Sequence, residues 1–411
     1  MILRVPKIYL INKQQLVRTL FLVGMLVIYL GSLFPWFFWP LGGFYLAIGA
    51  AMFVSAMVID RHEQYGFFNR QDFLIPMLLY ILLSFYIIVV NAESPKNYII
   101  NLFHIAIYYT LFRVSTTQLP SVSDFISKAM GWLLLVSMAF FLLYVLGFPL
   151  PSVNAQFRDG FYTFSNYFFF LLDDRSLSWI IPRFQGVFLE PGHLGTATSF
   201  LLFTQSGKWR RWYNIVLIVA TLITFSLSAY VLLTAIIIMN LWVQRKNFIG
   251  KLLAVAALFG IIIAGSFVYR DGDNMLHDLI LLRLEVDDGE LAGNNRVTED
   301  FQSEFDSFLE SDDILFGREM DYDISGNSGY QVFIYDNGFV GLILLWTFYL
   351  LSMWAAPDRR AWAAVMFIAL LAFLARGYLM WYNYYIPFFC VAFSNYLPPP
   401  LKSSEPSTAA T

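Results

Sequence analysis

The sequence predicts an all-α, polytopic membrane protein with about twelve transmembrane helices. Of its 411 residues, 58% are hydrophobic and only 13% are charged, whereas a soluble domain usually has about 25% charged residues. The apolar residues form long runs, and a membrane-spanning helix needs roughly 20 mostly apolar residues. The lysines and arginines gather in short segments between these runs. This pattern excludes an ordinary soluble domain.

Twelve apolar segments are candidates for these helices. The first follows Arg4, Lys7, Lys13 and Arg18 and has no small-residue cleavage site beside it. We therefore expect a retained first helix rather than a removed signal peptide. The segments lie near 19–35, 42–59, 73–91, 98–113, 126–147, 193–206, 212–227, 229–244, 250–269, 331–354, 361–375 and 379–397.

The boundary between the seventh and eighth segments is the least distinct. It lies at Ser226-Leu-Ser228, where no polar loop separates the two apolar runs. A tight hairpin, or a helix interruption that lines a cavity, would explain the serines. The alternative is one long, bent helix, and it would reverse the sidedness of every later segment.

The distribution of basic residues favours twelve segments over eleven. Lysines and arginines in short loops mark the cytoplasmic side, and only twelve segments put every dense basic cluster on one side. We therefore expect both termini in the cytoplasm. The residues on that side would be Arg4, Lys7, Lys13, Arg18, Arg61, Arg70, Arg113, Lys128, Lys208, Arg210, Arg211, Arg245, Lys246, Lys251, Arg359, Arg360 and Lys402, most of the 26 lysines and arginines.

Two long loops would then face outward from a single transmembrane domain, residues 1–397, and we expect short interfacial helices in them. The first loop, about 148–192, contains an aromatic stretch over 161–172 that suits a helix lying in the membrane interface. The second, about 270–330, is acidic and has no lysine, and it can face outward because acids contribute little to orientation. Residues 398–411 are predicted to form a disordered cytoplasmic tail.

One polar stretch, from Arg183 to Gly195, opens the sixth apolar segment and is the first candidate for a functional site. Pro191 suits the first position of a helix, so Glu190 would lie beside the positive end of the helix dipole. Backbone donors at such a helix start, with Arg183 just upstream, can bind an anionic group such as phosphate. His193 is a candidate general base or phosphate donor. The alternative is an interfacial histidine whose partners are satisfied.

Three further arginines are candidates for binding a phosphate-bearing substrate: Arg296, Arg318 and Arg376. A guanidinium can bind phosphate through two parallel hydrogen bonds, and it stays charged at any relevant pH. For Arg376 the alternative is an arginine that extends from the chain to the interface. For Arg296 and Arg318 the alternative is pairing with the surrounding acids.

A second unusual junction joins the glycine-rich segment 325–330 to an apolar segment that carries Asp336 about one turn inside. A buried acid in a membrane suggests function, whereas a helix cap with glycines for close helix packing is the structural alternative. No metal site is expected, because Asp321 and Asp323 begin like a calcium loop that then lacks its bidentate glutamate. Cys390 is the only cysteine, so no disulfide forms within the chain.

These motifs together resemble a known family. The pattern Arg183-x-x-Gly186-x-Phe188-x-Glu190-Pro191-Gly192 is similar to the outer-loop signature of bacterial O-antigen and capsule repeat-unit polymerases of the Wzy type. Asn295-Arg296, Leu315-Phe316-Gly317, Asn327-Ser328-Gly329-Tyr330 and Gly338-Phe-Val-Gly341 are similar to the second outer loop and the following helix of that superfamily. The resemblance covers roughly residues 180–345 in pattern and the whole chain in topology.

Two departures favour a polymerase over the related O-antigen ligases. The ligases usually have a histidine just ahead of the Asn-Ser-x-Tyr-like segment, where this chain has Ser325 and Gly326. They also tend to have an arginine after the serine that ends a middle helix, where this chain has Ser226-Leu-Ser228-Ala.

The resemblance implies a glycosyltransferase of the bacterial inner membrane whose active site faces the periplasm. Members of the family join undecaprenyl-diphosphate-linked oligosaccharides, without a metal or another cofactor, in O-antigen, capsule or exopolysaccharide synthesis. The implied partners are this donor and acceptor, membrane lipid and a polysaccharide chain-length regulator protein, and not nucleic acid. The implied catalytic residues are Glu190, His193, Arg183 and Arg296, and the implied substrate-binding residues are Arg318, Tyr330, Arg376, Asn327 and Trp381.

The resemblance also implies a division of roles. The arginines would neutralise the departing diphosphate. Glu190 or His193 would accept the proton of the attacking sugar hydroxyl, and Tyr330 and Trp381 would stack on sugar rings.

Two rival functions stay open. One is an O-antigen ligase that transfers lipid-linked glycan to the lipid A core, and the other is a flippase or transporter of the same lipid-linked sugar. A flippase should line its cavity with charges within several helices. Here the apolar segments are nearly free of charge, with Asp336 the main exception, which favours chemistry at the outer face.

Overall fold

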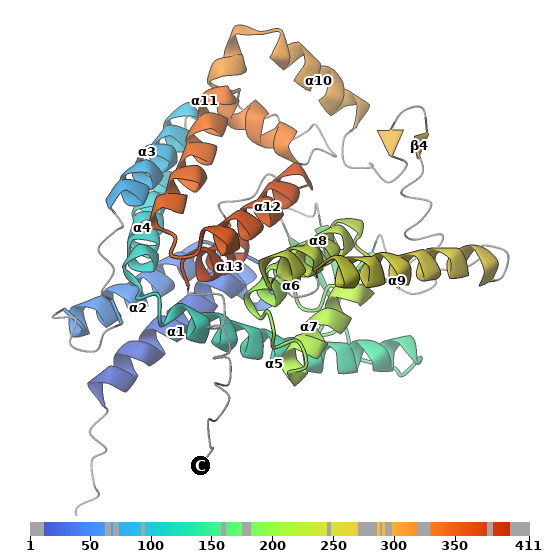
Figure 1. Cartoon of the computed structure of the whole chain (residues 1–411). Coiled ribbons are helices and arrows are strands. Elements are labelled where there is room, and N and C mark those ends of the chain that lie inside the picture. Colours follow the sequence, from blue (N-terminus) through green and yellow to red (C-terminus); the bar gives the residue numbers. More distant parts are fainter. Residues whose placement is uncertain are drawn as a thin grey trace, which may run out of the picture.

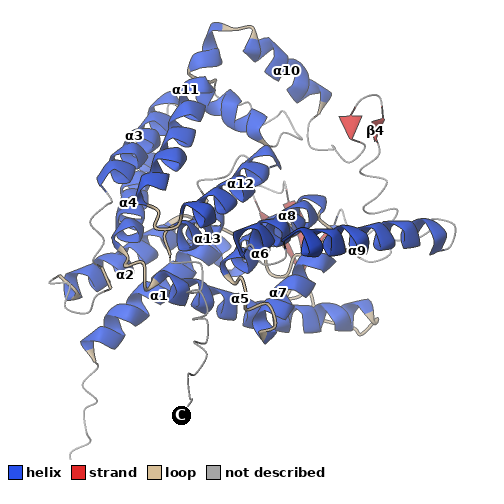
Figure 2. Cartoon of the chain, viewed as in Figure 1, coloured by secondary structure: helices blue, strands red, loops and turns tan. Residues whose placement is uncertain are grey.

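The computed structural model describes residues 12–61, 67–68, 74–91, 95–157, 162–174, 182–244, 248–269, 286–287, 290–291, 298–318, 329–375 and 381–394. Most of these residues are helical, and Figure 2 shows only small strands beside the helices. The α-helices are α1 Lys13–Gly31, α2 Phe44–Ile59, α3 Leu74–Val90, α4 Pro95–Arg113, α5 Leu119–Val145, α6 Pro191–Thr204, α7 Trp212–Ile223, α8 Leu227–Gln244, α9 Phe248–Val268, α10 Glu299–Leu309, α11 Tyr330–Leu351, α12 Arg359–Ala375 and α13 Tyr382–Ala392. The short 3₁₀ helices are η1 Trp36–Leu41, η6 Asp312–Leu315 and η7 Ser352–Ala355.

Each of the twelve predicted apolar segments coincides with a helix, namely α1 to α9 and α11 to α13. Among the described residues, three helices are long and apolar enough to cross a membrane: Lys13–Gly31, Leu119–Val145 and Tyr330–Trp354. Large apolar side chains such as Phe44 and Ile249 are exposed on the helices, as suits a protein surrounded by lipid. The chain therefore has the character of a membrane protein.

The helices do not all share one direction. Figure 1 shows α3, α4 and α11 running up one side of the molecule, while α5 and α9 lie across it. The number of helices that cross the bilayer stays a prediction, and so does the cytoplasmic location of both termini.

Two short helices, α6 and α13, form the centre of the fold. Every residue from Gly192 to Phe203 and from Tyr382 to Ala392 is buried. Helix α6 packs against α7, α8 and α13, and α13 also packs against α1, α5 and α12. With 14 residues, α6 is about 21 Å long, less than the roughly 30 Å of a bilayer's hydrocarbon core. Other helices surround α6 and α13, so these two carry buried side chains on all their faces.

The chain between α7 and α8 is an interruption rather than one continuous helix. Helix α7 ends at Ile223 and α8 begins at Leu227, and Phe225 between them has a positive φ of 46°, which a helix does not contain. The hydroxyls of Ser226 and Ser228 lie 3.1 Å apart. The predicted break is therefore present, and the single bent helix is not.

The described residues of the segment predicted as the first outer loop form a sheet, so the interfacial helix expected over 161–172 is wrong. Strands β1 Val153–Phe157, β2 Tyr162–Asn166 and β3 Leu171–Asp173 make an antiparallel sheet in the order β1-β2-β3. In β2, aromatic side chains alternate with small polar ones, which is the period of a strand. The Asn166 side chain then accepts a hydrogen bond from the Phe168 backbone at 2.8 Å, an asparagine turn that ends the strand.

The segment predicted as the second outer loop does contain a helix. Thr298 caps α10 by accepting a hydrogen bond from the Phe301 backbone at 3.2 Å. The helix buries Phe301, Phe305 and Phe308 on one face, against the start of α11. A further strand pair, β4 Val286–Asp287 and β5 Glu290–Leu291, precedes it. The described part of the chain is thus mainly helical, with two small sheets added to the predicted all-α pattern.

Helix α11 is broken about two turns inside its start. Gly338 has a φ of 63° and a ψ of −178°, and the chain at Leu315 to Arg318 packs against the break. The Arg318 backbone N–H donates to the Tyr335 carbonyl at 2.7 Å, and the Tyr86 hydroxyl of α3 donates to the Asn337 carbonyl at 2.8 Å. These bonds satisfy carbonyls that an unbroken helix would satisfy itself.

Candidate functional site

The stretch that precedes α6 is fixed to three parts of the fold through its backbone. The Leu171 N–H of β3 donates to the Gly186 carbonyl at 2.7 Å, the Trp36 N–H donates to the Val187 carbonyl at 3.0 Å, and the Phe184 N–H donates to the Ile223 carbonyl at 3.1 Å. Gly186 adopts a φ of 60°, which glycine accepts at little cost. The stretch is therefore a built part of the core.

Glu190 is the residue that precedes α6, and two groups lie beside its carboxylate. The Tyr162 hydroxyl of β2 donates a hydrogen bond to Glu190 Oε1 at 2.7 Å, and His193 Nε2 lies 3.6 Å from Glu190 Oε2. The Glu190 side chain is 24% exposed and the His193 side chain is 5% exposed. The Glu190 carboxylate is therefore partly open to the surroundings of the protein, while His193 lies buried beside it.

His193 also meets the start of α13. Its ring packs edge-on against Trp381, with ring centroids 5.2 Å apart, and Trp381 in turn packs against Phe34 at 5.5 Å. Further along both helices, Phe200 of α6, two turns after His193, contacts Tyr384 of α13, one turn after Trp381. Their ring centroids are 5.5 Å apart. The two central helices thus begin together and run in the same general direction. Their positive dipole ends lie on one side of the core, as an anion site requires.

Arg183 lies at the break between α7 and α8. Its Nε donates to the Thr224 carbonyl at 3.0 Å, so the guanidinium lies at the C-terminal end of α7, where a positive charge is favourable. Thr224 also lies close to α6, because a Cβ on Gly195 would be 3.1 Å from the Thr224 hydroxyl oxygen. Arg183 and the first turns of α6 therefore flank the same residue.

Arg318 belongs to another cluster, formed by α10, η6 and α11. Its Nη1 donates to Glu304 Oε1 at 2.9 Å and its Nε donates to Asp313 Oδ2 at 3.0 Å. The Tyr335 hydroxyl also donates to Glu304 Oε1 at 2.9 Å. The hydrogen bond to Asp313 raises the pKa of the Arg318 guanidinium. This is the pairing with acids that the alternative interpretation expects, and substrate binding by Arg318 stays a prediction.

The structure brings together only part of the predicted site. Glu190, His193 and Trp381 meet, with Arg183 nearby, whereas Figure 1 shows α10 well apart from α6. Tyr330 is the exposed first residue of α11. Arg296, Asn327 and Arg376 lie outside the described residues.

Tyr162 is the functional candidate that sequence reasoning missed. It lies in the aromatic stretch predicted as an interfacial helix, and its contact with Glu190 depends on the sheet. The alternation of aromatic and polar residues in β2 is the signal that could have placed it.

The described residues include no group of three His, Cys, Asp or Glu side chains arranged to hold a metal ion. No protein-family model, curated protein or solved structure matches this chain. The resemblance to the polymerases rests on the motifs of the sequence.

Proposed function

We propose that this protein is a membrane glycosyltransferase that polymerises lipid-diphosphate-linked oligosaccharide repeat units on the outer face of the bacterial inner membrane. The observation that carries the proposal is the meeting of Glu190, Tyr162, His193 and Trp381 where the two buried helices α6 and α13 begin. A carboxylate that can act as a base, an aromatic side chain and the positive ends of two helix dipoles therefore lie next to one another. Those are the groups that transfer of a sugar from a phosphate requires.

Each group has a part in the reaction. A hydroxyl of the acceptor sugar attacks the anomeric carbon of the donor, the bond from that carbon to the diphosphate oxygen breaks, and the lipid diphosphate leaves with the bonding electrons. Glu190 accepts the hydroxyl proton, because its carboxylate is reachable from outside. The helix starts and Arg183 stabilise the negative charge that develops on the diphosphate.

The neighbours of Glu190 set its orientation. Tyr162 holds one carboxylate oxygen through a hydrogen bond, which leaves Oε2 on the His193 side to receive the proton. His193 and Trp381 hold each other edge-on, so the Trp381 ring can offer a fixed surface to a sugar ring.

A surface-glycan gel from a strain that lacks this protein tests the proposal. Glycan that carries a single repeat on its core is the expected result. Unattached polymer accumulating on the lipid carrier would mean a ligase, and the absence of any outward-facing repeat would mean a flippase; either result would overturn the proposal.

A transporter is the second candidate, and one observation favours it. Helix α11 is interrupted at Gly338 beside Asp336, and interrupted helices bind substrates and ions in many transporters. An Asp336→Asn variant separates the two functions. It should leave the ladder of glycan lengths unchanged if transport is not the activity, whereas loss of outward-facing repeats would support transport.

A further inference from the structure

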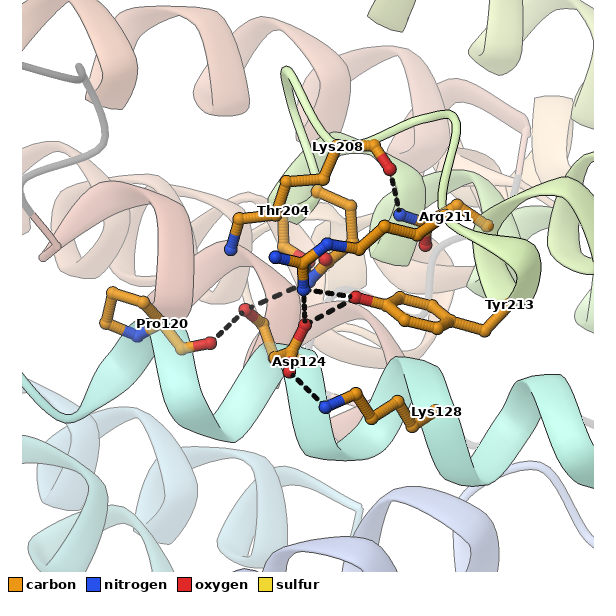
Figure 3. A network of polar contacts seen from close by, with 10 residues as sticks. Pro120, Asp124, Lys128, Thr204, Lys208, Arg211 and Tyr213 are labelled. Atoms are coloured by element: carbon orange, nitrogen blue, oxygen red, sulfur yellow. Dashed lines mark hydrogen bonds and ion pairs between the residues drawn. The ribbon is translucent and has the colours of Figure 1, made fainter.

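A second polar network joins α5 to the start of α7 and includes neither Glu190 nor the residues that contact it (Figure 3). Asp124 is at its centre. Arg211 Nη1 donates to Asp124 Oδ1 at 2.8 Å, Lys128 Nζ lies 2.8 Å from Asp124 Oδ2, and the Tyr213 hydroxyl donates to Asp124 Oδ1 at 2.5 Å. One half-buried carboxylate thus fixes two cations and a phenol.

The close contact of α5 with α7 makes this network possible. A Cβ on Gly131 would lie 2.5 Å from Tyr213 Cβ, so only glycine lets the start of α7 approach α5 this closely. Tyr213 is then buried, with Lys128 Nζ and the Arg211 guanidinium each 6.0 Å from its ring centre. Lys128 of α5 and Arg211, the residue just before α7, thus both lie beside a single aromatic ring.

The network leaves positive charge on the surface. The Lys128 side chain is 51% exposed and that of Arg211 is 45% exposed, against 21% for Asp124. Lys208 and Arg210 lie in the turn just before Arg211. We call Lys128, Lys208, Arg210 and Arg211 the basic corner. It has more cations than the single carboxylate can neutralise.

An exposed tryptophan pair lies next to the basic corner. Trp132, one turn after Lys128, is 61% exposed, and Trp212 is 41% exposed. Their ring centroids are 4.7 Å apart. From this pair an exposed apolar strip continues along α5 and α7. It consists of Leu135, Val136, Ile215, Val219 and Leu222.

We infer that the basic corner and the tryptophan pair form a binding site for the headgroup of an anionic phospholipid of the cytoplasmic leaflet. Tryptophans favour the level of the headgroups, and basic residues near an anionic membrane surface gain about 1 kcal/mol each. Charge complementarity selects an anionic headgroup, and the apolar strip suits the acyl chains of the same molecule. The inference rests on the membrane location and on the cytoplasmic side in the proposed function, but not on the transfer chemistry.

Native mass spectrometry of the detergent-purified protein with added phosphatidylglycerol or phosphatidylcholine tests this site. Retained phosphatidylglycerol should exceed retained phosphatidylcholine. The Lys128→Gln variant should lower phosphatidylglycerol affinity about fivefold, the loss expected for one cation, and Trp132→Phe should lower it as well. Lys251→Gln on α9 is the matched control and should change nothing. Arg211 keeps its own bond to Asp124 in Lys128→Gln, so the melting temperature should stay near that of the unchanged protein.

Equal retention of the two lipids would overturn the inference, as would an equal effect of Lys128→Gln and Lys251→Gln. Displacement of the lipid by millimolar inorganic phosphate would also overturn it, because the site would then bind phosphate rather than a lipid. The measurement involves no glycosyl transfer, so a protein that binds the lipid but makes no polymer would refute the proposed function and leave this site standing.

Discussion

Glu190 is the residue on which the proposed chemistry depends, and its environment suits a base. One oxygen is held by Tyr162 and the other lies beside His193. The sequence predicted the importance of Arg183, Glu190 and His193 because they lie close together in the chain at a helix start. The alternating pattern could have placed Tyr162 in a strand, but not the contacts that Tyr162 makes with Glu190 and Trp381 makes with His193, since those contacts join different parts of the chain.

The Glu190→Gln variant separates charge from shape. Glutamine fits the same space and can still accept the Tyr162 hydrogen bond, but it cannot accept a proton. We expect polymer formation to fall by about 10²- to 10⁴-fold, the contribution of a general base, with little change in melting temperature. Glu310→Gln at the exposed end of α10 is the control. Near-normal rates for Glu190→Gln would remove this residue from catalysis.

Tyr162→Phe tests whether the hydrogen bond orients Glu190. A hydrogen bond to a charged group is worth about 1.5–3 kcal/mol, so the rate should fall roughly 10- to 100-fold. The pH profile of the rate should also shift, whereas a purely structural role of Tyr162 would leave the profile unchanged. A slower enzyme with an unaltered profile would contradict the orienting role.

Substitutions of Arg183 test whether this residue binds the diphosphate. Arg183→Ala should reduce polymerisation by about 10²- to 10³-fold, the effect of losing one electrostatic contact in the transition state. Arg183→Lys keeps the charge but loses the planar fork, so partial activity is expected. Arg359→Ala, an exposed arginine at the start of α12, is the control. Wild-type glycan ladders from Arg183→Ala would refute the role.

At the scale of the elements, hydrophobic patterning predicted the helices well. Each apolar run forms a helix because burying or embedding its side chains requires the backbone to satisfy its own hydrogen bonds. The prediction of an interfacial helix over 161–172 was wrong for a physical reason. Its aromatic residues were assigned to a membrane interface, yet Phe164 and Leu171 pack with Leu189 next to the site, and only tertiary contacts decide between these outcomes.

The packing of α6 against α8 depends on Gly195. An added Cβ there would lie 2.5 Å from Ala229 Cβ, so Gly195→Ala should destabilise the protein by about 1–3 kcal/mol, the usual cost of overpacking. Gly260→Ala is the matched control, because a Cβ on that α9 glycine meets nothing within 4 Å. Thermal unfolding in detergent checks both variants. An equal melting temperature for the two would show that α6 and α8 do not pack this closely.

At the scale of the whole molecule, the proposed chemistry requires both long loops to lie on the side of the membrane opposite the cytoplasm. Cysteines placed at the exposed positions Asn154 and Asp312 should react with an impermeant thiol reagent from outside, and cysteines at Lys208 and Lys251 should not, because basic residues stay in the cytoplasm. If the cysteine at Asn154 reacts while the one at Asp312 is protected, the interruption between α7 and α8 does not return the chain across the bilayer.

The central claim is that this one protein lengthens a lipid-linked glycan. The most direct test is purified protein in vesicles with a lipid-diphosphate-linked oligosaccharide as the only substrate, followed by separation of the products by size. The account predicts products of two or more repeats together with released lipid diphosphate, and neither product from Glu190→Gln. An oligosaccharide that stays one repeat long, whether or not it moves across the bilayer, would contradict it.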